Sequence, residues 1–377
     1  MQKVFTYIFF LNLLSLNAQI SFQKIESSSL DETRFIDTYY PENSNNQIES
    51  MPLIIVLEGH ELFDLVVSNV KFLSKIGYMP KSIVVGIRQE KPNQTFKDCQ
   101  VDKNTGYLTA NSQNFMRFIS SEVLPIIAAK YGNPYLKLII AKNYSANFIN
   151  HFILDPNPVF STYISITPEF SVSLSEKIQE SVETINRPVN YYVSNSENLT
   201  TRQQKSVSSL IEILKNSQNK NLKFISNTFS SPDEFSSPTY SIPIALESIF
   251  KVYQPISPKE YREKLMMSNT SLHKYLTEKY RIIFQQLGVQ KKYILNDIAA
   301  IFEASKRKND IETIFVLAEV CLKQYPEKMI GHYFNGFGYE LMDENKKALK
   351  SYEKAYNYQP IDFITKELIL SKIESLK

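Results

Sequence analysis

The chain has 377 residues, with 42 Lys and Arg against 39 Asp and Glu, four His, two Cys, nine Gly and no Trp. A net charge of +3 that comes from nearly balanced signs gives no reason to expect nucleic-acid binding, and two cysteines cannot build a disulfide framework. Glycine makes up about 2.4% of the chain, against a usual share of roughly 7%. Because phosphate loops and nucleophile turns rely on glycine, this composition leaves little room for catalysis.

The first 21 residues, MQKVFTYIFFLNLLSLNAQIS, have the pattern of a secretory signal peptide. Lys3 precedes an apolar run that reaches about Leu16, and the small residue Ala18 precedes Gln19. The run is shorter than the roughly 20 residues that cross a bilayer, and no later stretch approaches that length. We therefore expect residues 1–18 to be removed and the mature protein to be exported, periplasmic or secreted, without a membrane span. A buried N-terminal strand or helix is the alternative.

Residues 19–254 alternate between apolar runs typical of strands and amphipathic stretches typical of helices. Runs such as LIIVL, SIVVGI and LKLIIA are continuously apolar, as expected for strands buried on both faces of a parallel sheet. The pattern predicts strands at 34–40, 52–57, 82–87, 136–141, 161–166, 189–193 and 222–226. It predicts helices at 62–76, 114–130, 145–154, 203–217 and 242–252, and polar loops at 41–50 and 90–112. This alternation indicates an α/β domain with a mostly parallel sheet flanked by helices.

The last part of the chain, 259–377, is helix-forming throughout, and its only prolines, Pro326 and Pro360, are 34 residues apart. A 34-residue period is that of the tetratricopeptide repeat, which the sequence resembles at about 295–328 and 329–362, followed by a capping helix. The residues that carry the resemblance in the second unit are Gly336, Tyr339, Ala348, Tyr352, Ala355 and Pro360. The resemblance implies a surface for another protein; alternatively, this all-α tail packs against the α/β domain.

The segment around the strand at 136–141 resembles the esterase family of α/β hydrolases that includes esterase D and enterochelin esterase. Members of that family read as a strand, then G-H-S-L-G-G, then a helix, with the serine as nucleophile. Further similarities are LEG at 57–59, the strand at 82–87, QNFMRFISSEVLPII at 113–127 and YISITP at 163–168. The resemblance implies an α/β-hydrolase fold over 19–254 and carboxylic-ester hydrolysis as the family activity.

The turn that carries the nucleophile in this family, however, lacks the nucleophilic serine in this sequence. On the family pattern Ala141 stands for the first glycine, Lys142 for the histidine and Asn143 for the nucleophilic serine, while Ser145 and Ala146 replace the last two glycines. An asparagine amide is not a nucleophile. Asparagine does tolerate the left-handed backbone conformation. We therefore expect Asn143 to preserve the backbone turn but not to act as a nucleophile.

The general base is missing as well. The family places a histidine after its last strand, but the corresponding loop at 229–243, FSSPDEFSSPTYSIP, contains none, and Phe235 or a neighbour takes that position. Glu197 is the available acid after the strand at 189–193. A carboxylate without the histidine that it orients does nothing for acyl transfer. We therefore predict a hydrolase-like protein that has lost its activity and acts in binding or scaffolding, with room for a small ligand in the former pocket.

An active ester hydrolase with a rearranged site is the alternative. It would use Ser145 as nucleophile, although a helix N-cap is the plainer role for this serine. His60 or His151 would be the base: His60 follows Gly59 in the loop where the family places an oxyanion donor, and His151 otherwise packs in the interior.

No metal or cofactor is predicted. Glu58, Glu61 and Asp64 form an acidic group, but a solvated helix start explains these residues without a cation. Cys99 and Cys321 fall in different halves of the chain, and whether they pair is left open.

Overall fold

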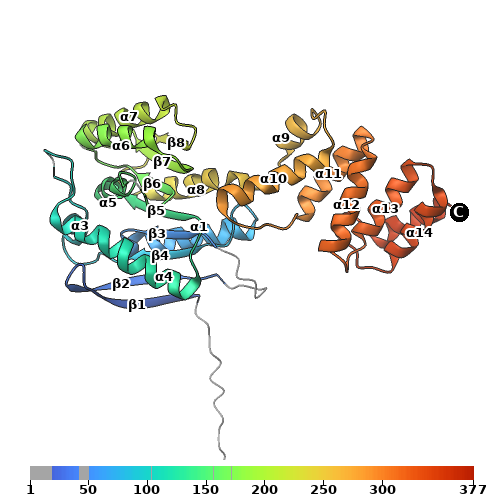
Figure 1. Ribbon diagram of the computed structural model, residues 1–377, viewed down its shortest axis with the longest axis horizontal. Helices are drawn as coiled ribbons and strands as arrows, with labels where there is room; N and C mark the ends of the chain where they lie inside the picture. Colours follow the sequence, from blue (N-terminus) through green and yellow to red (C-terminus); the bar gives the residue numbers. More distant parts are fainter. Residues whose placement is uncertain (1–18, 42–50, 103, 156, 171) are drawn as a thin grey trace, which may run out of the picture.

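The computed structural model describes residues 19–41, 51–102, 104–155, 157–170 and 172–377, so the predicted signal peptide and most of the 41–50 loop lie outside the described part. Eight strands form one sheet in the order β1-β2-β4-β3-β5-β6-β7-β8 (Figure 1). The strand β2 is antiparallel to both β1 and β4, and the remaining neighbours are parallel. The strands are β1 Ile20–Ser27, β2 Glu32–Tyr39, β3 Leu53–Val56, β4 Ile83–Ile87, β5 Lys137–Lys142, β6 Thr162–Ile166, β7 Val189–Ser196 and β8 Leu222–Phe229.

Helices cover both faces of this sheet, each over its own hydrophobic cluster. On one face α1 and α8 pack against residues such as Ile54, Val56 and Ile140. On the other face α3 to α7 pack against Ile55, Ile139 and their neighbours. The helices are α1 Gly59–Lys75, α2 Gln94–Cys99, α3 Ala110–Arg117, α4 Leu124–Tyr131, α5 Asn143–Phe148, α6 Val172–Thr184, α7 Thr201–Asn216 and α8 Ser237–Ile249. The predicted α/β class is therefore confirmed.

Three elements of the structure were not predicted from the sequence. The edge strand β1 buries few of its side chains, so its apolar signal is weak. The helix α2 lies inside the predicted 90–112 loop. The helix α6 was not predicted, although its buried Leu174, Ile178 and Val182 recur every four residues. The predicted 229–243 loop is also too long, because α8 begins at Ser237. Its proline at position 238 stands in the first turn, where a missing N–H costs no hydrogen bond.

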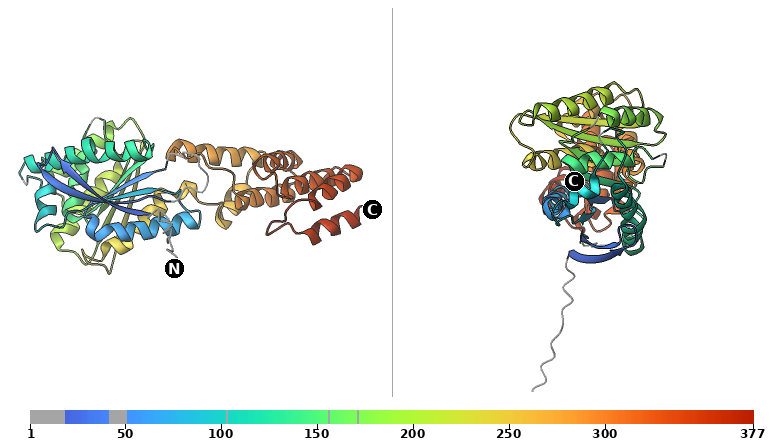
Figure 2. Two further views of the ribbon diagram at one scale, coloured as in Figure 1. Left: turned by 90° about the horizontal axis from the view of Figure 1, so that it is seen from below. Right: turned by 90° about the vertical axis from the view of Figure 1, so that its left-hand side faces the viewer.

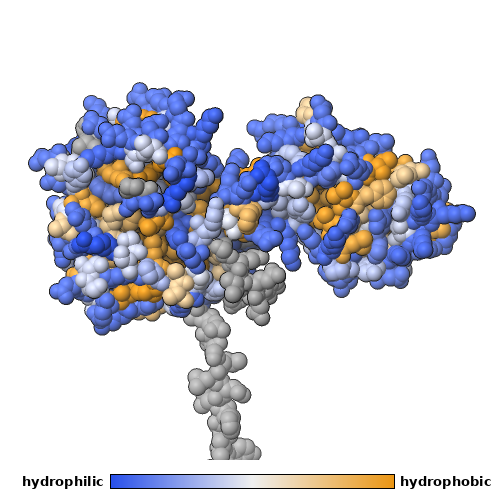
Figure 3. All heavy atoms as spheres, in the orientation of Figure 1, coloured by the Kyte–Doolittle hydropathy of each residue, from blue (hydrophilic) through white to orange (hydrophobic). Residues whose placement is uncertain are grey.

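The C-terminal part is all helical and extends from one end of the sheet as an elongated arm (Figure 2). Its helices are α9 Pro258–Glu260, α10 Leu272–Leu287, α11 Leu295–Lys308, α12 Ile311–Gln324, α13 Ile330–Leu341, α14 Asn345–Tyr356 and α15 Lys366–Ser375. On the face shown in Figure 3, apolar residues gather over α12 and α13. No helix in the described part of the chain is both long and apolar enough to cross a membrane.

The arm and the sheet share one hydrophobic cluster. Buried residues under α1 and α8 continue through Ile256, Leu265 and Leu272 into α10 to α15. At the junction the fully buried Asp297 accepts hydrogen bonds from the backbone N–H of Ile256 (2.7 Å) and from the Tyr280 hydroxyl (2.9 Å). Packing between arm and sheet, one of the two predicted roles of the tail, is thus present in the structure.

The residues that the repeat pattern singled out lie mainly between α13 and α14. Gly336, Ala348, Tyr352 and Ala355 are buried, whereas the ring of Tyr339 meets that of Phe315 on α12 at 5.1 Å. Pro360 follows α14 and is exposed. A Cβ atom at Gly336 would lie 2.6 Å from the Tyr352 ring, so the two helices approach more closely there than any other residue allows.

Substituting Gly336→Ala is expected to lower the free energy of unfolding by about 2 kcal/mol, because overpacking outweighs the better helix propensity of alanine. Chemical denaturation of the full chain measures this change. Lys346→Ala on the exposed side of α14 is the control and should shift stability by less than about 0.5 kcal/mol. Equal stability of the two variants would contradict the close helix contact.

Candidate functional site

The carboxyl ends of three neighbouring strands carry residues in the left-handed backbone conformation. Glu58 follows β3 with φ 51°, Asn143 follows β5 with φ 47° and Thr167 follows β6 with φ 43°. Non-glycine residues rarely adopt this conformation, and such strain concentrates where a fold positions functional groups. The edge formed by β3, β5 and β6 is therefore the candidate site.

Asn143 lies at the sharp turn from β5 into α5, as the sequence pattern predicted. Its side-chain oxygen Oδ1 accepts a hydrogen bond from the Thr167 hydroxyl at 2.9 Å. The positive φ of Asn143 supplies the abrupt reversal that a nucleophile turn requires. The backbone geometry is therefore present, with an amide side chain where an acyl-transfer enzyme needs a hydroxyl or thiol.

Ser145 is fully buried, and its hydroxyl is held by several groups. Its Oγ lies 2.5 Å from Oε1 of Glu58 and 2.8 Å from the Lys142 carbonyl oxygen, and it accepts a hydrogen bond from the Lys142 N–H at 3.3 Å. The serine is the third residue of α5, so it caps the helix from inside the first turn and not from the N-cap position itself. A hydroxyl in these surroundings ties the strand end, the helix and Glu58 together.

A small ionic group surrounds that serine. The ammonium of Lys142, on a side chain only 8% exposed, lies 2.5 Å from Oε2 of Glu61 and 3.9 Å from Oε2 of Glu58. Burial raises the pKa of Glu58, while the hydrogen bond from Ser145 and the charge of Lys142 oppose that rise. The hydrogen bond from Lys142 lowers the pKa of Glu61. One ammonium contacts two carboxylates, so ion pairs hold the group together, but it is not neutral when both carboxylates are ionised.

Gly59 brings this group close to the sheet. A Cβ atom at Gly59 would lie 2.6 Å from the backbone of Gly86, so only glycine lets the start of α1 approach β4 this closely.

The two candidate bases have different surroundings, and His60 belongs to the ionic group through Glu61. His60 Nε2 is 3.5 Å from Oε1 of Glu61 at the start of α1. His151 is buried, and its Nε2 lies 3.1 Å from the Gly106 carbonyl oxygen, which makes Nε2 the protonated nitrogen. Neither histidine has a hydrogen bond to Asn143 or Ser145 among the residues that the structure describes.

The candidate acid is also detached. Glu197 follows β7 at the surface, where its backbone N–H donates to the Phe229 carbonyl oxygen at 2.8 Å. Phe235, at the position expected for the family histidine, is 74% exposed. The structure thus brings Asn143, Ser145 and Lys142 together with Glu58, and His60 reaches this group only through Glu61.

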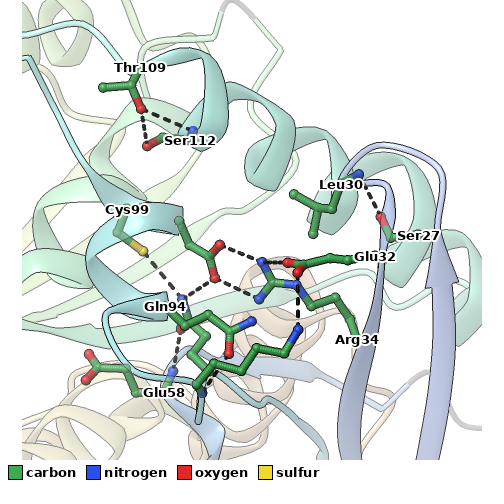
Figure 4. A network of polar contacts seen from close by, with 12 residues as sticks. Ser27, Leu30, Glu32, Arg34, Glu58, Gln94, Cys99, Thr109 and Ser112 are labelled. Atoms are coloured by element: carbon green, nitrogen blue, oxygen red, sulfur yellow. Dashed lines mark hydrogen bonds and ion pairs between the residues drawn. The ribbon is translucent and has the colours of Figure 1, made fainter.

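A buried polar chain that the sequence did not reveal leads to Glu58 (Figure 4). The guanidinium of Arg34 on β2 makes two hydrogen bonds, of 2.8 and 2.6 Å, to the carboxylate of Asp98 on α2. Gln89 donates to the same carboxylate at 2.9 Å and accepts from the Glu58 N–H at 3.0 Å. In the sequence, only Arg34 could have indicated this chain of contacts, because a charged residue on the same strand face as the fully buried Ile36 needs a buried partner.

Metal and disulfide chemistry find no support in the described residues. No group of three or more His, Cys, Asp or Glu side chains in that part of the chain could hold a metal ion. Cys99 and Cys321 are both free and buried.

Comparison with known proteins identifies the fold. No family model and no curated protein matches the chain. An uncharacterised protein from Capnocytophaga ochracea DSM 7271 is 29% identical with a TM-score of 0.81, covering 95% of this chain and 99% of that one. An IroE-like serine hydrolase from Shewanella oneidensis is 17% identical with a TM-score of 0.61, covering 80% and 98%. The siderophore hydrolase EstB from Aspergillus nidulans is 11% identical with a TM-score of 0.53, covering 66% and 97%. The chain has the α/β-hydrolase fold of these enzymes, followed by an all-helical region.

Asp98→Asn is expected to lower the free energy of unfolding by about 3 kcal/mol, because it removes the bidentate carboxylate partner of the buried Arg34 guanidinium and leaves it the single contact with Glu32 at 2.7 Å. Thermal and chemical denaturation measure the loss. Lys323→Gln, which breaks the solvent-exposed pair with Glu319 on α12, is the control and should cost less than about 1 kcal/mol. Similar losses for the two variants would be evidence against the central role of the buried pair.

His151 should make stability depend on pH. Burial lowers its pKa from 6.5 to about 4, so the folded chain binds fewer protons than the unfolded chain between these values. The resulting stabilisation is present above pH 6.5 and is lost as the pH falls towards 4, by about 3 kcal/mol. Denaturation at pH 7 and pH 4 tests this with His151→Gln, which keeps a donor for Gly106 but should lack that share of the pH dependence. Parallel behaviour of variant and parent would refute it.

Proposed function

We propose that this protein no longer hydrolyses esters and acts instead by binding. The observation that carries the proposal is Asn143 at the left-handed turn between β5 and α5, hydrogen-bonded to Thr167. An amide there preserves the turn but provides no group that can attack a carbonyl carbon. Fold similarity alone does not establish activity, because function depends on the groups at the site.

The surroundings of the turn support the same proposal. The sequence between β8 and α8 contains no histidine, and His151 uses its protonated nitrogen on Gly106. Acyl transfer at a serine requires a base within about 3 Å of the hydroxyl. Because His60 contacts Glu61 and His151 contacts Gly106, we expect neither histidine to activate a serine at position 143.

Two kinds of binding partner fit the proposal. The serine hydrolase and siderophore hydrolase that share the fold suggest an ester-like or siderophore-like compound at the carboxyl edge of the sheet. The repeat-like helices, with apolar residues gathered over α12 and α13, suggest a second protein on the arm (Figure 3). We further propose that the chain is exported, on the basis of the signal-peptide pattern at its start.

One observation favours a second candidate, an ester hydrolase with Ser145 as nucleophile. The 2.5 Å contact between Ser145 Oγ and Glu58 resembles a hydroxyl held by a carboxylate base. Complete burial of Ser145 argues against this candidate, since a substrate carbonyl would have to reach an oxygen with no exposed surface.

A fluorophosphonate probe and a p-nitrophenyl ester test both candidates. The purified chain is expected to remain unlabelled and to hydrolyse the ester no faster than buffer. Asn143→Ser should raise the rate of ester hydrolysis by less than tenfold over that background, because no base is in place. Labelling that Ser145→Ala abolishes would establish the second candidate, and labelling that survives Ser145→Ala would show another nucleophile; either result overturns the proposed loss of activity.

A further inference from the structure

The strand β8 forms one edge of the sheet, with β7 on one side and no described strand on the other (Figure 1). Its sequence, LKFISNTF, contains no proline and a single charged residue, Lys223. Proteins usually protect an edge strand with several charges, a proline or a bulge, because an unprotected edge pairs readily with another strand. The edge at β8 has little of this protection.

The side chains of β8 are incompletely covered. None of them is buried, whereas every side chain of β7 except that of Asn190 is buried. Leu222 and Phe224 lie against the hydrophobic cluster under α7, and Ile225 lies against the cluster under α8. The strand therefore leaves apolar surface on both faces that a neighbouring strand and its helices would cover.

The backbone groups on the outer side of β8 have no partners. The N–H of Glu197 donates to the carbonyl oxygen of Phe229, so the odd-numbered residues of β8 face β7. The N–H and C=O groups of the even-numbered residues point the other way, because neighbouring residues alternate. Within the described part of the chain, no hydrogen bond involves the N–H or C=O groups of Phe224, Ser226 and Thr228. The edge thus offers a row of free donors and acceptors.

These free groups are complementary to those of a second copy of the same strand. In an antiparallel pair, two opposite residues exchange both of their hydrogen bonds, and such pairs recur at every second residue. If Ser226 lies opposite Ser226 of a second copy, Phe224 lies opposite Thr228 of that copy, and all the free groups are used. In this register Lys223 lies opposite Phe229 of the second copy, so the two Lys223 charges stay apart.

The charges on either side of β8 also favour antiparallel pairing with a second copy. Lys220 precedes the strand, and Asp233 and Glu234 follow it. Among the described residues, neither Lys220 nor Glu234 takes part in an ion pair. The same register places Lys220 opposite Pro232 of the second copy, next to its Asp233 and Glu234. Opposite charges therefore meet at both ends of the pair, whereas parallel strands would bring like charges together.

We propose that β8 is a dimer interface at which a second copy of this chain continues the sheet. The two strands run antiparallel about a two-fold axis at Ser226, so the same surface serves both copies. A stable interface covers about 800 Å² on each partner, which is more than one strand supplies. The interface therefore includes two exposed aromatic residues that follow β8, Phe235 and Tyr240, the second with its ring 5.8 Å from that of Phe229. This interface is independent of the proposed loss of hydrolase activity.

Sedimentation velocity of the full chain at about 1 to 100 μM protein tests the interface, and a dimer is expected at the upper end of this range. Ser226→Pro removes the N–H at the two-fold axis, which an edge strand tolerates, and should raise the dissociation constant of the dimer by about tenfold or more. Lys24→Pro removes an outward N–H from β1 at the opposite edge of the sheet. It is the matched control and should leave the dissociation constant unchanged.

A charge swap tests the antiparallel register without a proline. Lys220→Glu and Glu234→Lys should each raise the dissociation constant about tenfold, because like charges then meet at both ends of the pair. The double variant restores opposite charges and should return to within about threefold of the parent. Lys346→Glu, on the exposed side of α14, makes the same change of charge away from β8 and should have no effect.

Three results would overturn the proposal: a monomer at every concentration, a dimer that Ser226→Pro leaves as tight as before, or a dimer that both single charge reversals leave as tight as before. Circular dichroism confirms that each variant is folded. If Ser226→Pro is not folded, the charge variants alone decide the outcome.

Discussion

The buried ion pair between Arg34 and Asp98 is the constraint on which the arrangement of the site depends. Both side chains are only 2% exposed, and Asp98 is the fully buried partner of a guanidinium that also contacts Glu32 at 2.7 Å, so loss of Asp98 would leave most of the buried charge uncompensated. Gln89 connects this pair to the backbone of Glu58, and the Glu58 carboxylate connects to Ser145. One chain of polar contacts therefore joins β2, α2 and the ends of β3, β4 and β5, which are far apart in the sequence.

This chain of contacts explains how a catalytic geometry can persist without catalysis. The positive φ values at the ends of β3, β5 and β6 are costly conformations, and each is maintained by contacts of its own side chain or backbone. Ser145, Glu58 and Lys142 are committed to one another. Groups that would be reactive in an open pocket serve here to hold the strand ends in register.

Local patterns in the sequence were sufficient for most of the sheet and for the turn at Asn143. Continuous apolar runs located the central strands, and the resemblance to the esterase pattern placed the turn at Asn143, whose tolerance for a left-handed backbone let it keep that turn. The contacts of Glu58 with Ser145 and of Arg34 with Asp98 join residues 87 and 64 positions apart, and no local pattern encodes such pairs. The six-residue helix α2 is too short to show a period, whereas the four-residue spacing of Leu174, Ile178 and Val182 in α6 was a signal that the prediction did not use.

The continuous hydrophobic cluster from α1 and α8 into the arm has a consequence for how the molecule comes apart. Cleavage of the chain between α8 and α9 would not yield two independent halves, because each would expose apolar surface that the other covers. Unfolding should consequently spread across the junction as one cooperative event. The shared cluster and the hydrogen bond from Ile256 to Asp297 tie the first helices of the arm to the sheet, so a change that loosens one part should also weaken the other.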